Sequence, residues 1–201
     1  MYIIVIIIGY LFGMLSPSAL LSKLKKKNLR TSGSGNLGAT NTMMVLGKGY
    51  GIIVMLLDIG KSFLAVKLSQ HLFPELPYVG IAAGIAAVAG HIYPFYMKFK
   101  GGKGLAAYGG LVLALEPWMF QVMLIVCAAI MIITNHGVAM AMSVCILYPI
   151  LYIIYTGDVG GFLLLAALGV LVIINHRKNL KEAAQKKQVK VRDYIKNHIF
   201  Q

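Results

Sequence analysis

The chain has 201 residues, of which 59% are apolar and only 12% are charged. Soluble domains are about half apolar and about a quarter charged, so this composition excludes an ordinary soluble domain. The abundance of apolar residues also excludes intrinsic disorder. We therefore expect the chain to lie in a lipid bilayer.

Basic residues dominate the charge, with 19 Lys and Arg against 6 Asp and Glu, a formal net charge of +13. They lie between long apolar runs and in one tail, which is typical of cytoplasmic segments beside anionic lipid headgroups. We therefore expect anionic membrane lipids as partners and no nucleic acid. Cys127 and Cys145 lie in apolar stretches and lack CxxC spacing, so a disulfide framework is not indicated.

The first apolar run covers residues 2–21, and four lysines follow it with no positive charge before it. That order is the reverse of a secretory signal and predicts a retained helix whose N-terminus lies outside. A polar, glycine-rich stretch occupies 22–48. The later apolar runs cover 49–70, 78–97, 105–115, 118–134, 137–156 and 159–175, and a basic tail fills 177–201. About 20 helical residues cross the hydrocarbon, so most of these runs are long enough.

The run 105–115 is the exception, since about 11 residues of helix reach only some 17 Å. If 105–134 crossed only once, the basic tail would lie outside, against the positive-inside rule. We therefore predict an all-α, polytopic membrane helix bundle of seven transmembrane helices, with the N-terminus outside and the C-terminus cytoplasmic. Residues 1–176 would form the transmembrane domain and 177–201 a basic cytoplasmic tail, either an interfacial helix or disordered.

Small residues in the third run, Gly80, Gly84 and Gly90, predict close helix–helix approach. The first polar cluster runs from Ser32 to Asn41 and holds three glycines, two serines, two asparagines and a threonine. Successive amides beside a helix N-terminus can bind phosphate. A flexible linker is an equally open alternative, although a linker would not need the Gly-Ala-Thr-Asn half.

The second polar cluster is Lys98–Gly104, where glycines permit close backbone approach and lysines can pair with phosphate. A plain positive-inside loop is its strong alternative. His91 lies upstream, inside an apolar run. A histidine that packs between helices and is hydrogen-bonded to a neighbouring group is favoured there over a direct chemical role.

The third polar cluster is Asn175–Asn179. A role in the site and an ordinary membrane-interface anchor are equally weighted interpretations of it. Asp58 and Lys61 are spaced i, i+3 and so share one helix face. Charged groups at that depth pair or line a cavity, and a structural ion pair is favoured over catalysis.

Several familiar chemistries are excluded by the sequence. Gly60-Lys61-Ser62 resembles the end of a P-loop, but Met55 stands where its first glycine is required. The chain has no GxSxG elbow, no HExxH or Cys/His zinc set, and no His-x4-Asp pattern. The remaining polar groups suit phosphate binding and charge stabilisation more than they suit supply of a protein nucleophile.

Together and in this order, four segments resemble the bacterial acyl-phosphate:glycerol-3-phosphate acyltransferases, the PlsY family: Gly33–Asn41, Gly90–Gly104, His176–Asn179 and the smaller Leu57–Lys61. The resemblance covers nearly the whole chain, including the seven-span layout. It implies an enzyme of the bacterial cell membrane whose active site faces the cytoplasm. Such an enzyme moves a fatty acyl group from acyl phosphate to the 1-hydroxyl of sn-glycerol 3-phosphate, giving lysophosphatidic acid in phospholipid biosynthesis. No metal or cofactor is implied.

The resemblance also implies residue roles, with catalysis by Ser34, Lys103 and His176. Substrate binding is implied for Gly33, Gly35, Asn36, Gly38, Thr40, Asn41, His91, Lys100, Gly101, Gly102, Gly104 and Asn179. Asp58 and Lys61 would have structural or supporting roles. Proton transfer to a phosphate oxygen of the substrate is favoured over His176 as general base, but the sequence does not choose between them.

The chain departs from the family pattern at several positions. Met44 replaces an arginine expected to hold phosphate, and Ser62 replaces a glycine. Thr134–Gly137 replaces an arginine-tyrosine pair, and Lys178 replaces a glutamate. Another cation would have to compensate for the missing arginine: Lys48, Lys100 or Lys103. A non-catalytic relative that binds a phosphorylated lipid precursor stays open, and a transporter ranks third because few polar residues lie near mid-bilayer.

Overall fold

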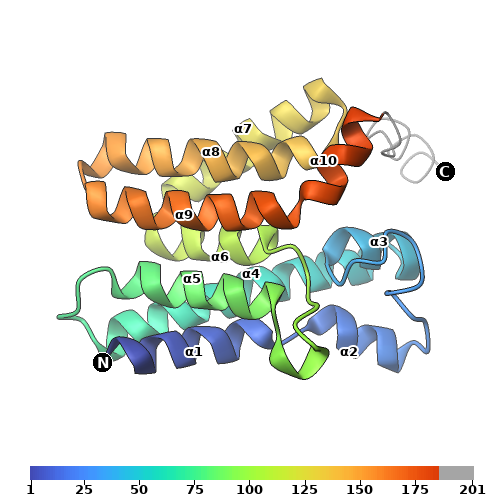
Figure 1. Ribbon diagram of the computed structural model, residues 1–201, viewed down its shortest axis with the longest axis horizontal. Coiled ribbons are helices and arrows are strands. Elements are labelled where there is room, and N and C mark those ends of the chain that lie inside the picture. The colour runs from blue at the N-terminus through green and yellow to red at the C-terminus, as the bar shows by residue number, and fades with distance from the viewer. Residues whose placement is uncertain (186–201) are drawn as a thin grey trace. The chain divides into compact units, whose positions relative to one another are not determined.

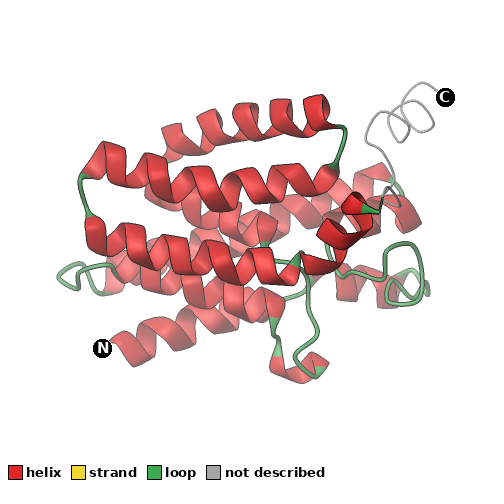
Figure 2. Ribbon diagram, turned by 45° about the horizontal axis from the view of Figure 1, so that its top comes forward, coloured by secondary structure: helices red, strands yellow, loops and turns green. Residues whose placement is uncertain are grey.

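The computed structural model describes residues 1–185, and every regular element in that part of the chain is helical (Figures 1 and 2). The α-helices are α1 (Tyr2–Met14), α2 (Pro17–Leu24), α3 (Ala39–Leu46), α4 (Lys48–Leu72), α5 (Val79–Ile92), α6 (Leu105–Leu115), α7 (Pro117–Thr134), α8 (Gly137–Thr156), α9 (Val159–Asn175) and α10 (Arg177–Ala184). A short 3-10 helix, η1, covers Phe95–Met97. The chain forms two compact units, Met1–Pro117 and Trp118–Gln201.

The first unit is built on close helix packing. α1 lies along α5, and α4 packs against α1, α3, α5 and α6 (Figure 1). A Cβ at Gly13 of α1 would lie 2.0 Å from the Ala87 carbonyl oxygen of α5, and one at Gly90 would lie 2.4 Å from the Tyr10 oxygen. A Cβ at Gly84 would lie 2.2 Å from Leu111 of α6. The predicted close approach of α5 to its neighbours is confirmed.

A break at Leu15 and Ser16 divides the first apolar run into α1 and α2. Ser16 caps α2 by accepting the Ala19 N–H at 3.3 Å, and proline takes the first helical position. The broken backbone leaves carbonyls without helical partners, which is costly in lipid. Tyr96 donates its hydroxyl to the Met14 oxygen at 2.7 Å, and the Lys61 ammonium donates to the Leu15 oxygen at 2.6 Å. The break is therefore satisfied by side chains from η1 and α4.

The second unit packs α8 against α9, and α10 contacts both. A Cβ at Gly169 of α9 would lie 2.6 Å from the Cys145 carbonyl oxygen of α8, so this contact also needs a glycine. Asp158 caps α9 by accepting the Gly161 N–H at 3.1 Å. The chain bends by 58° between α9 and α10. α10 gives the predicted tail a helix up to Ala184, and residues 186–201 of that tail lie outside the described residues.

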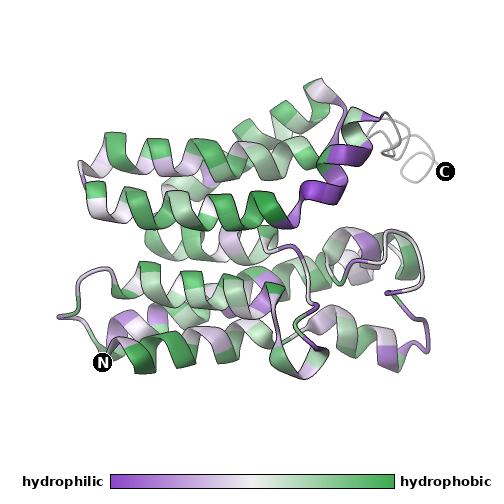
Figure 3. Cartoon of the chain, in the orientation of Figure 1, coloured by the Kyte–Doolittle hydropathy of each residue, from purple (hydrophilic) through white to green (hydrophobic). Residues whose placement is uncertain are grey.

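Four segments within residues 1–185 are long and apolar enough to cross a membrane, and a fifth counts if α9 and α10 form one span. These four are Tyr2–Leu24, Val79–Met97, Pro117–Thr134 and Gly137–Thr156. Hydrophobic residues predominate on α1, α5, α8 and α9, whereas hydrophilic residues gather in the loop before α3 and on α10 (Figure 3). The all-helical membrane fold is confirmed, and the seven crossings and their direction stay predictions.

The contact between α1 and α5 gives a test with a matched control. Gly13→Ala places a methyl group against a backbone oxygen, which we expect to destabilise the protein by about 2 kcal/mol. Gly60→Ala on α4 enters open space and gains about 1 kcal/mol of helix propensity. Thermal unfolding in detergent should therefore show a lower Tm for Gly13→Ala and an unchanged or higher Tm for Gly60→Ala. Equal Tm values for the two variants would contradict this packing.

Candidate active site

The first polar cluster is a folded turn that leads into α3. Gly33 and Gly35 have φ values of 59° and 72°, in the left-handed region that favours glycine. A Cβ at Gly33 would also lie 2.3 Å from the Asn41 Oδ1. Gly38 precedes the first residue of α3, and its carbonyl oxygen accepts from both the N–H and the hydroxyl of Thr42. These constraints favour a built site over the flexible linker.

Asn41 is the fully buried hub of this turn. Its Oδ1 accepts the Ser34 N–H at 2.7 Å, and its Nδ2 donates to the Leu29 oxygen at 2.8 Å and to the Asn36 oxygen at 2.9 Å. The Asn41 amide therefore fixes the turn from inside, and its implied contact with substrate stays a prediction. The side of the turn that carries Ser34 is exposed.

The second polar cluster packs its glycines against the end of α5. Gly101 donates its N–H to the Ile92 oxygen at 2.8 Å, and Gly102 donates to the His91 oxygen at 3.0 Å. A Cβ at Gly101 would lie 2.1 Å from that same His91 oxygen, and one at Gly102 would lie 2.1 Å from the His91 Nε2. Both N–H groups are used within the protein, so close packing is the structural reason for these glycines. Their implied contact with substrate stays a prediction.

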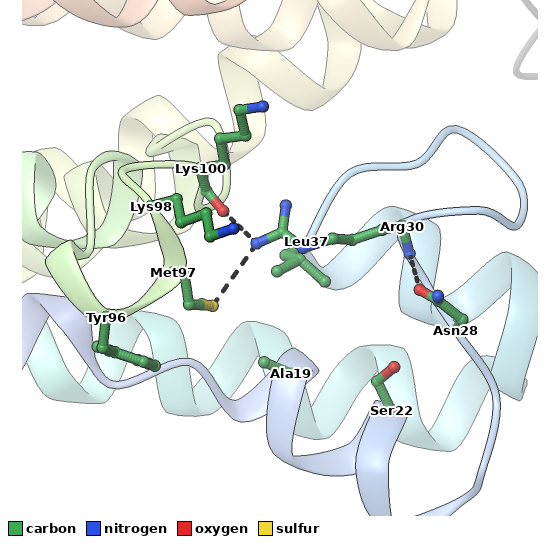
Figure 4. Close-up of a pocket in the computed structure, with 9 residues that line it drawn as sticks. All are labelled: Ala19, Ser22, Asn28, Arg30, Leu37, Tyr96, Met97, Lys98 and Lys100. Atoms are coloured by element: carbon green, nitrogen blue, oxygen red, sulfur yellow. Dashed lines mark hydrogen bonds between the residues drawn. The ribbon is translucent and has the colours of Figure 1, made fainter.

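The first two clusters meet in the first unit, although more than sixty residues separate them along the chain. A Cβ at Gly102 would lie 2.7 Å from the Leu37 carbonyl oxygen. The Arg30 Nη2 donates to the Lys100 oxygen (Figure 4). Sequence reasoning missed Arg30, and the only signal for it was its place two residues before the glycine-rich stretch.

Both loops lead directly into helix N-termini, those of α3 and α6. The first N–H groups of a helix have no intrahelical partner and carry the positive end of its dipole, which favours a bound anion. Lysines add to this field: Lys100 is exposed, and the half-buried Lys103 makes contacts within the structure. Among the other predicted residues, Gly33 and Thr40 are exposed, whereas Gly35 and Asn36 are half-buried and Gly38 and Gly104 are buried.

Asp58, Lys61 and His91 form a buried polar cluster between α4 and α5. The Lys61 Nζ lies 2.8 Å from the Asp58 Oδ1 and 2.9 Å from the His91 Nδ1, and the His91 Nδ1 lies 3.3 Å from the Asp58 Oδ1. The spacing of Asp58 and Lys61 therefore does form an ion pair. His91 has bonded neighbours in this cluster, as the packing alternative predicted, and its other ring nitrogen faces Gly102.

The third polar cluster lies in the second unit, at the bend between α9 and α10. His176 is buried, and its Nδ1 lies 2.9 Å from the Val172 carbonyl oxygen. A carbonyl oxygen only accepts, so the Nδ1 carries a hydrogen in this contact. Asn179 is half-buried on α10 and makes contacts within the structure. The predicted meeting of this cluster with the other two stays a prediction.

The residues that depart from the family pattern have different surroundings. Met44 lies on α3 and is 40% exposed. Its thioether carries no charge that could replace the guanidinium of an arginine. Ser62 is buried against α6, where a Cβ at Gly110 would lie 2.9 Å from the Ser62 Cβ. Lys178 is exposed and lies 3.8 Å from the Glu182 carboxylate, a surface contact of little energetic weight. Within residues 1–185, no three His, Cys, Asp or Glu side chains cluster as metal ligands would.

The fold is that of an all-helical membrane protein, and its two joined loops bring exposed lysine charge and two helix N-termini to one place. The model of the glycerol-3-phosphate acyltransferase family matches residues 3–186, and the chain belongs to this family. The glycerol-3-phosphate acyltransferases of Bacillus velezensis and Bacillus subtilis are each 35% identical to it, over 94% of this chain and 97% of theirs. The enzyme of the same name from Myxococcus xanthus is 47% identical over 113 residues, 56% of this chain and 59% of its own.

Two solved structures have the same fold. They are crystal structures of PlsY, an integral membrane glycerol 3-phosphate acyltransferase, in a glycerol 3-phosphate form and a lysophosphatidic acid form. Their TM-scores are 0.88 and 0.86, with sequence identities of 30% and 29% and coverage of 94% of both chains.

The buried ion pair gives a prediction for stability. Lys61→Met leaves the Asp58 carboxylate buried beside His91 without its ammonium, which we expect to cost about 4 kcal/mol. The Tm in detergent should fall by about 10 °C. Lys67→Met is the matched control, because Lys67 is exposed on the same helix and its loss should leave the Tm unchanged.

A double variant separates the charge effect from the change in packing. Adding Asp58→Leu to Lys61→Met removes both charges, and we expect it to recover most of the lost stability. A Lys61→Met protein as stable as Lys67→Met would show that the pair does not contribute to the fold.

Proposed function

We propose that this acyltransferase moves a fatty acyl group from acyl phosphate to the 1-hydroxyl of sn-glycerol 3-phosphate, giving lysophosphatidic acid. The family supports the acceptor, since its curated members are named glycerol-3-phosphate acyltransferases and a solved relative is described with glycerol 3-phosphate. The observation that carries the proposal is the contact of Gly102 with Leu37, which joins two loops that both lead into helix N-termini. Such a site suits a substrate with a phosphate group.

The reaction needs positioning and charge stabilisation more than a strong nucleophile. The acceptor hydroxyl oxygen bonds to the acyl carbon, the acyl–phosphate bond breaks, and inorganic phosphate leaves with the electron pair. Ser34 and Lys103 hold and neutralise phosphate oxygens and the charge that develops on the carbonyl oxygen. A phosphate oxygen of the substrate accepts the hydroxyl proton.

His176 and Asn179 orient the acceptor in this proposal. The hydrogen bond from the His176 Nδ1 to the Val172 carbonyl oxygen supports the role, because it fixes the orientation of the imidazole ring. General-base catalysis by His176 is the competing form of the same step.

The membrane arrangement is part of the proposal. Seven crossings put the loops before α3 and α6 and the tail 177–201 on the cytoplasmic side of a bacterial cell membrane, with 1–176 as the catalytic domain. α4 has 25 residues, enough for one crossing, and pairs the Asp58 and Lys61 charges inside the protein. Glu75, Glu116 and Asp158 then lie in the outer loops, which agrees with the positive-inside rule. Anionic lipids face the basic tail.

A non-catalytic relative is the second candidate, and Met44 is the observation that favours it. Where the family pattern has an arginine, the exposed Met44 side chain offers no charge to a phosphate. Lys100 and Lys103 of the second loop supply positive charge in its place, so a phosphate group can be held without that arginine.

Purified protein mixed with palmitoyl phosphate and glycerol 3-phosphate tests the proposal, with lysophosphatidate as the product measured. We expect product with palmitoyl phosphate and none with palmitoyl-CoA. Ser34→Ala and Lys103→Ala should each lower kcat/KM by about 100-fold, because each removes a group that stabilises charge in the transition state. Lys67→Ala, which removes an exposed lysine of α4, should keep full activity.

Three results would contradict parts of this proposal. Full activity in Ser34→Ala and Lys103→Ala would exclude the assigned site. Transfer from palmitoyl-CoA at the same rate would exclude acyl phosphate as the specific donor. Tight binding of glycerol 3-phosphate without turnover would favour the non-catalytic relative, and recovery of turnover in Met44→Arg would then assign the loss to that position.

A further inference from the structure

A pocket of about 420 Å³ opens in the first unit between α2, the turn after η1 and the chain before the first glycine-rich loop (Figure 4). Three of its lining residues are cations, Arg30, Lys98 and Lys100, and none is acidic. Ser22 and Asn28 add a hydroxyl and an amide. The pocket therefore offers charge and hydrogen-bond donors to an anion.

Arg30 connects the two sides of the pocket. Its Nη2 donates to the Lys100 oxygen and lies 3.7 Å from the Met97 Sδ (Figure 4). These contacts use one of the guanidinium nitrogens, and the group as a whole carries five N–H donors. Arg30 thus anchors the turn after η1 and brings its positive charge to the pocket.

The turn that carries the two lysines is held in a costly conformation. Lys98 and Phe99 have φ values of 55° and 56°, and the Lys100 N–H closes the turn on the Met97 oxygen at 3.2 Å. Left-handed backbone is uncommon for residues other than glycine and is an outlier for a bulky aromatic residue. Such conformations cluster at ligand clamps. This turn is what places Lys98 and Lys100 at the same pocket.

Exposed apolar side chains accompany these cations along the chain. Tyr96, which lines the pocket, is 53% exposed, and its neighbours Phe95 and Phe99 are 55% and 60% exposed. Leu20 and Leu24 on α2 are exposed as well. Aromatic rings and cations together at helix ends are typical of the bilayer interface. A free phosphate ion would have no use for this apolar surface, whereas a lipid would.

We propose that this pocket binds the phosphate headgroup of an anionic membrane phospholipid, whose acyl chains lie along the exposed apolar residues of α2 and η1. Arg30 and Lys98 have no part in the proposed acyl transfer, and Lys100 is shared with the predicted substrate site. The lipid site is therefore a function beyond the transfer reaction.

Lys98→Asn and Lys26→Asn form a matched pair that tests the site. Lys26 is exposed, has a φ of 51° close to the 55° of Lys98, and does not line the pocket. Asparagine tolerates left-handed backbone, so each variant keeps its turn and loses one positive charge. Native mass spectrometry of the detergent-purified full chain, titrated with phosphatidylglycerol or phosphatidylcholine, measures lipid affinity.

We expect the wild type to bind phosphatidylglycerol more tightly than phosphatidylcholine, with an affinity that falls about fivefold in Lys98→Asn. Lys26→Asn should bind as the wild type does. Equal losses in both variants, or no loss in Lys98→Asn, would overturn the proposal, because diffuse surface charge would then account for the binding.

Two further measurements distinguish other occupants. Inorganic phosphate alone should bind weakly and displace little lipid, and full displacement by millimolar phosphate would overturn the proposal in favour of a soluble anion. The KM for glycerol 3-phosphate should not change in Lys98→Asn. A higher KM with unchanged lipid binding would assign the pocket to substrate and overturn it as well.

Discussion

The site depends on one close contact, in which the backbone of Gly102 packs directly against its neighbours because glycine has no side chain. Gly102 lies between the His91 ring and the Leu37 carbonyl oxygen, and a single added methyl group would collide with both. The second loop can therefore meet the first only through a glycine. Asn41 holds the first loop from the other side through three hydrogen bonds. Together these contacts fix the geometry of two loops that lead into helix N-termini.

A series of buried polar side chains supports the two joined loops. Lys61 contacts the Leu15 carbonyl oxygen at the break of α1 and α2, pairs with Asp58 and reaches His91, whose ring faces Gly102. Burying charges is expensive and adds little net stability, so a buried pair is best explained where it specifies geometry. Here the ion pair connects the break between α1 and α2 to the loop that precedes α6. We infer that this pair and His91 position the loop, and the contact with substrate implied for His91 stays a prediction.

Local patterns in the sequence predicted a large part of this structure. The predicted runs 118–134, 137–156 and 159–175 differ from α7, α8 and α9 by at most one residue, because turn residues limit long apolar segments there. The i, i+3 spacing of Asp58 and Lys61 predicted their ion pair. α3 was not predicted, because Ala39–Leu46 lies inside a stretch dominated by glycine and polar residues.

Long-range contacts were beyond what sequence patterns could show. The bond from Arg30 to Lys100 joins segments seventy residues apart. The glycines of the second cluster suggested backbone open to a ligand, but the N–H groups of Gly101 and Gly102 are bonded to the end of α5. No local pattern reveals that a carbonyl oxygen or a histidine ring lies where a Cβ would be. The roles assigned to His176 and Asn179 likewise depend on tertiary structure.

The most direct test of the account is the thermal shift that glycerol 3-phosphate induces in three proteins: the wild type, Gly102→Ala and Gly60→Ala. A ligand at about 100 times its Kd stabilises the folded state by about 2.7 kcal/mol. We expect saturating ligand to raise the Tm of the wild type and of Gly60→Ala equally, and to leave the Tm of Gly102→Ala unchanged. A Gly102→Ala protein with the full wild-type shift would contradict the claim that the joined loops form the phosphate site.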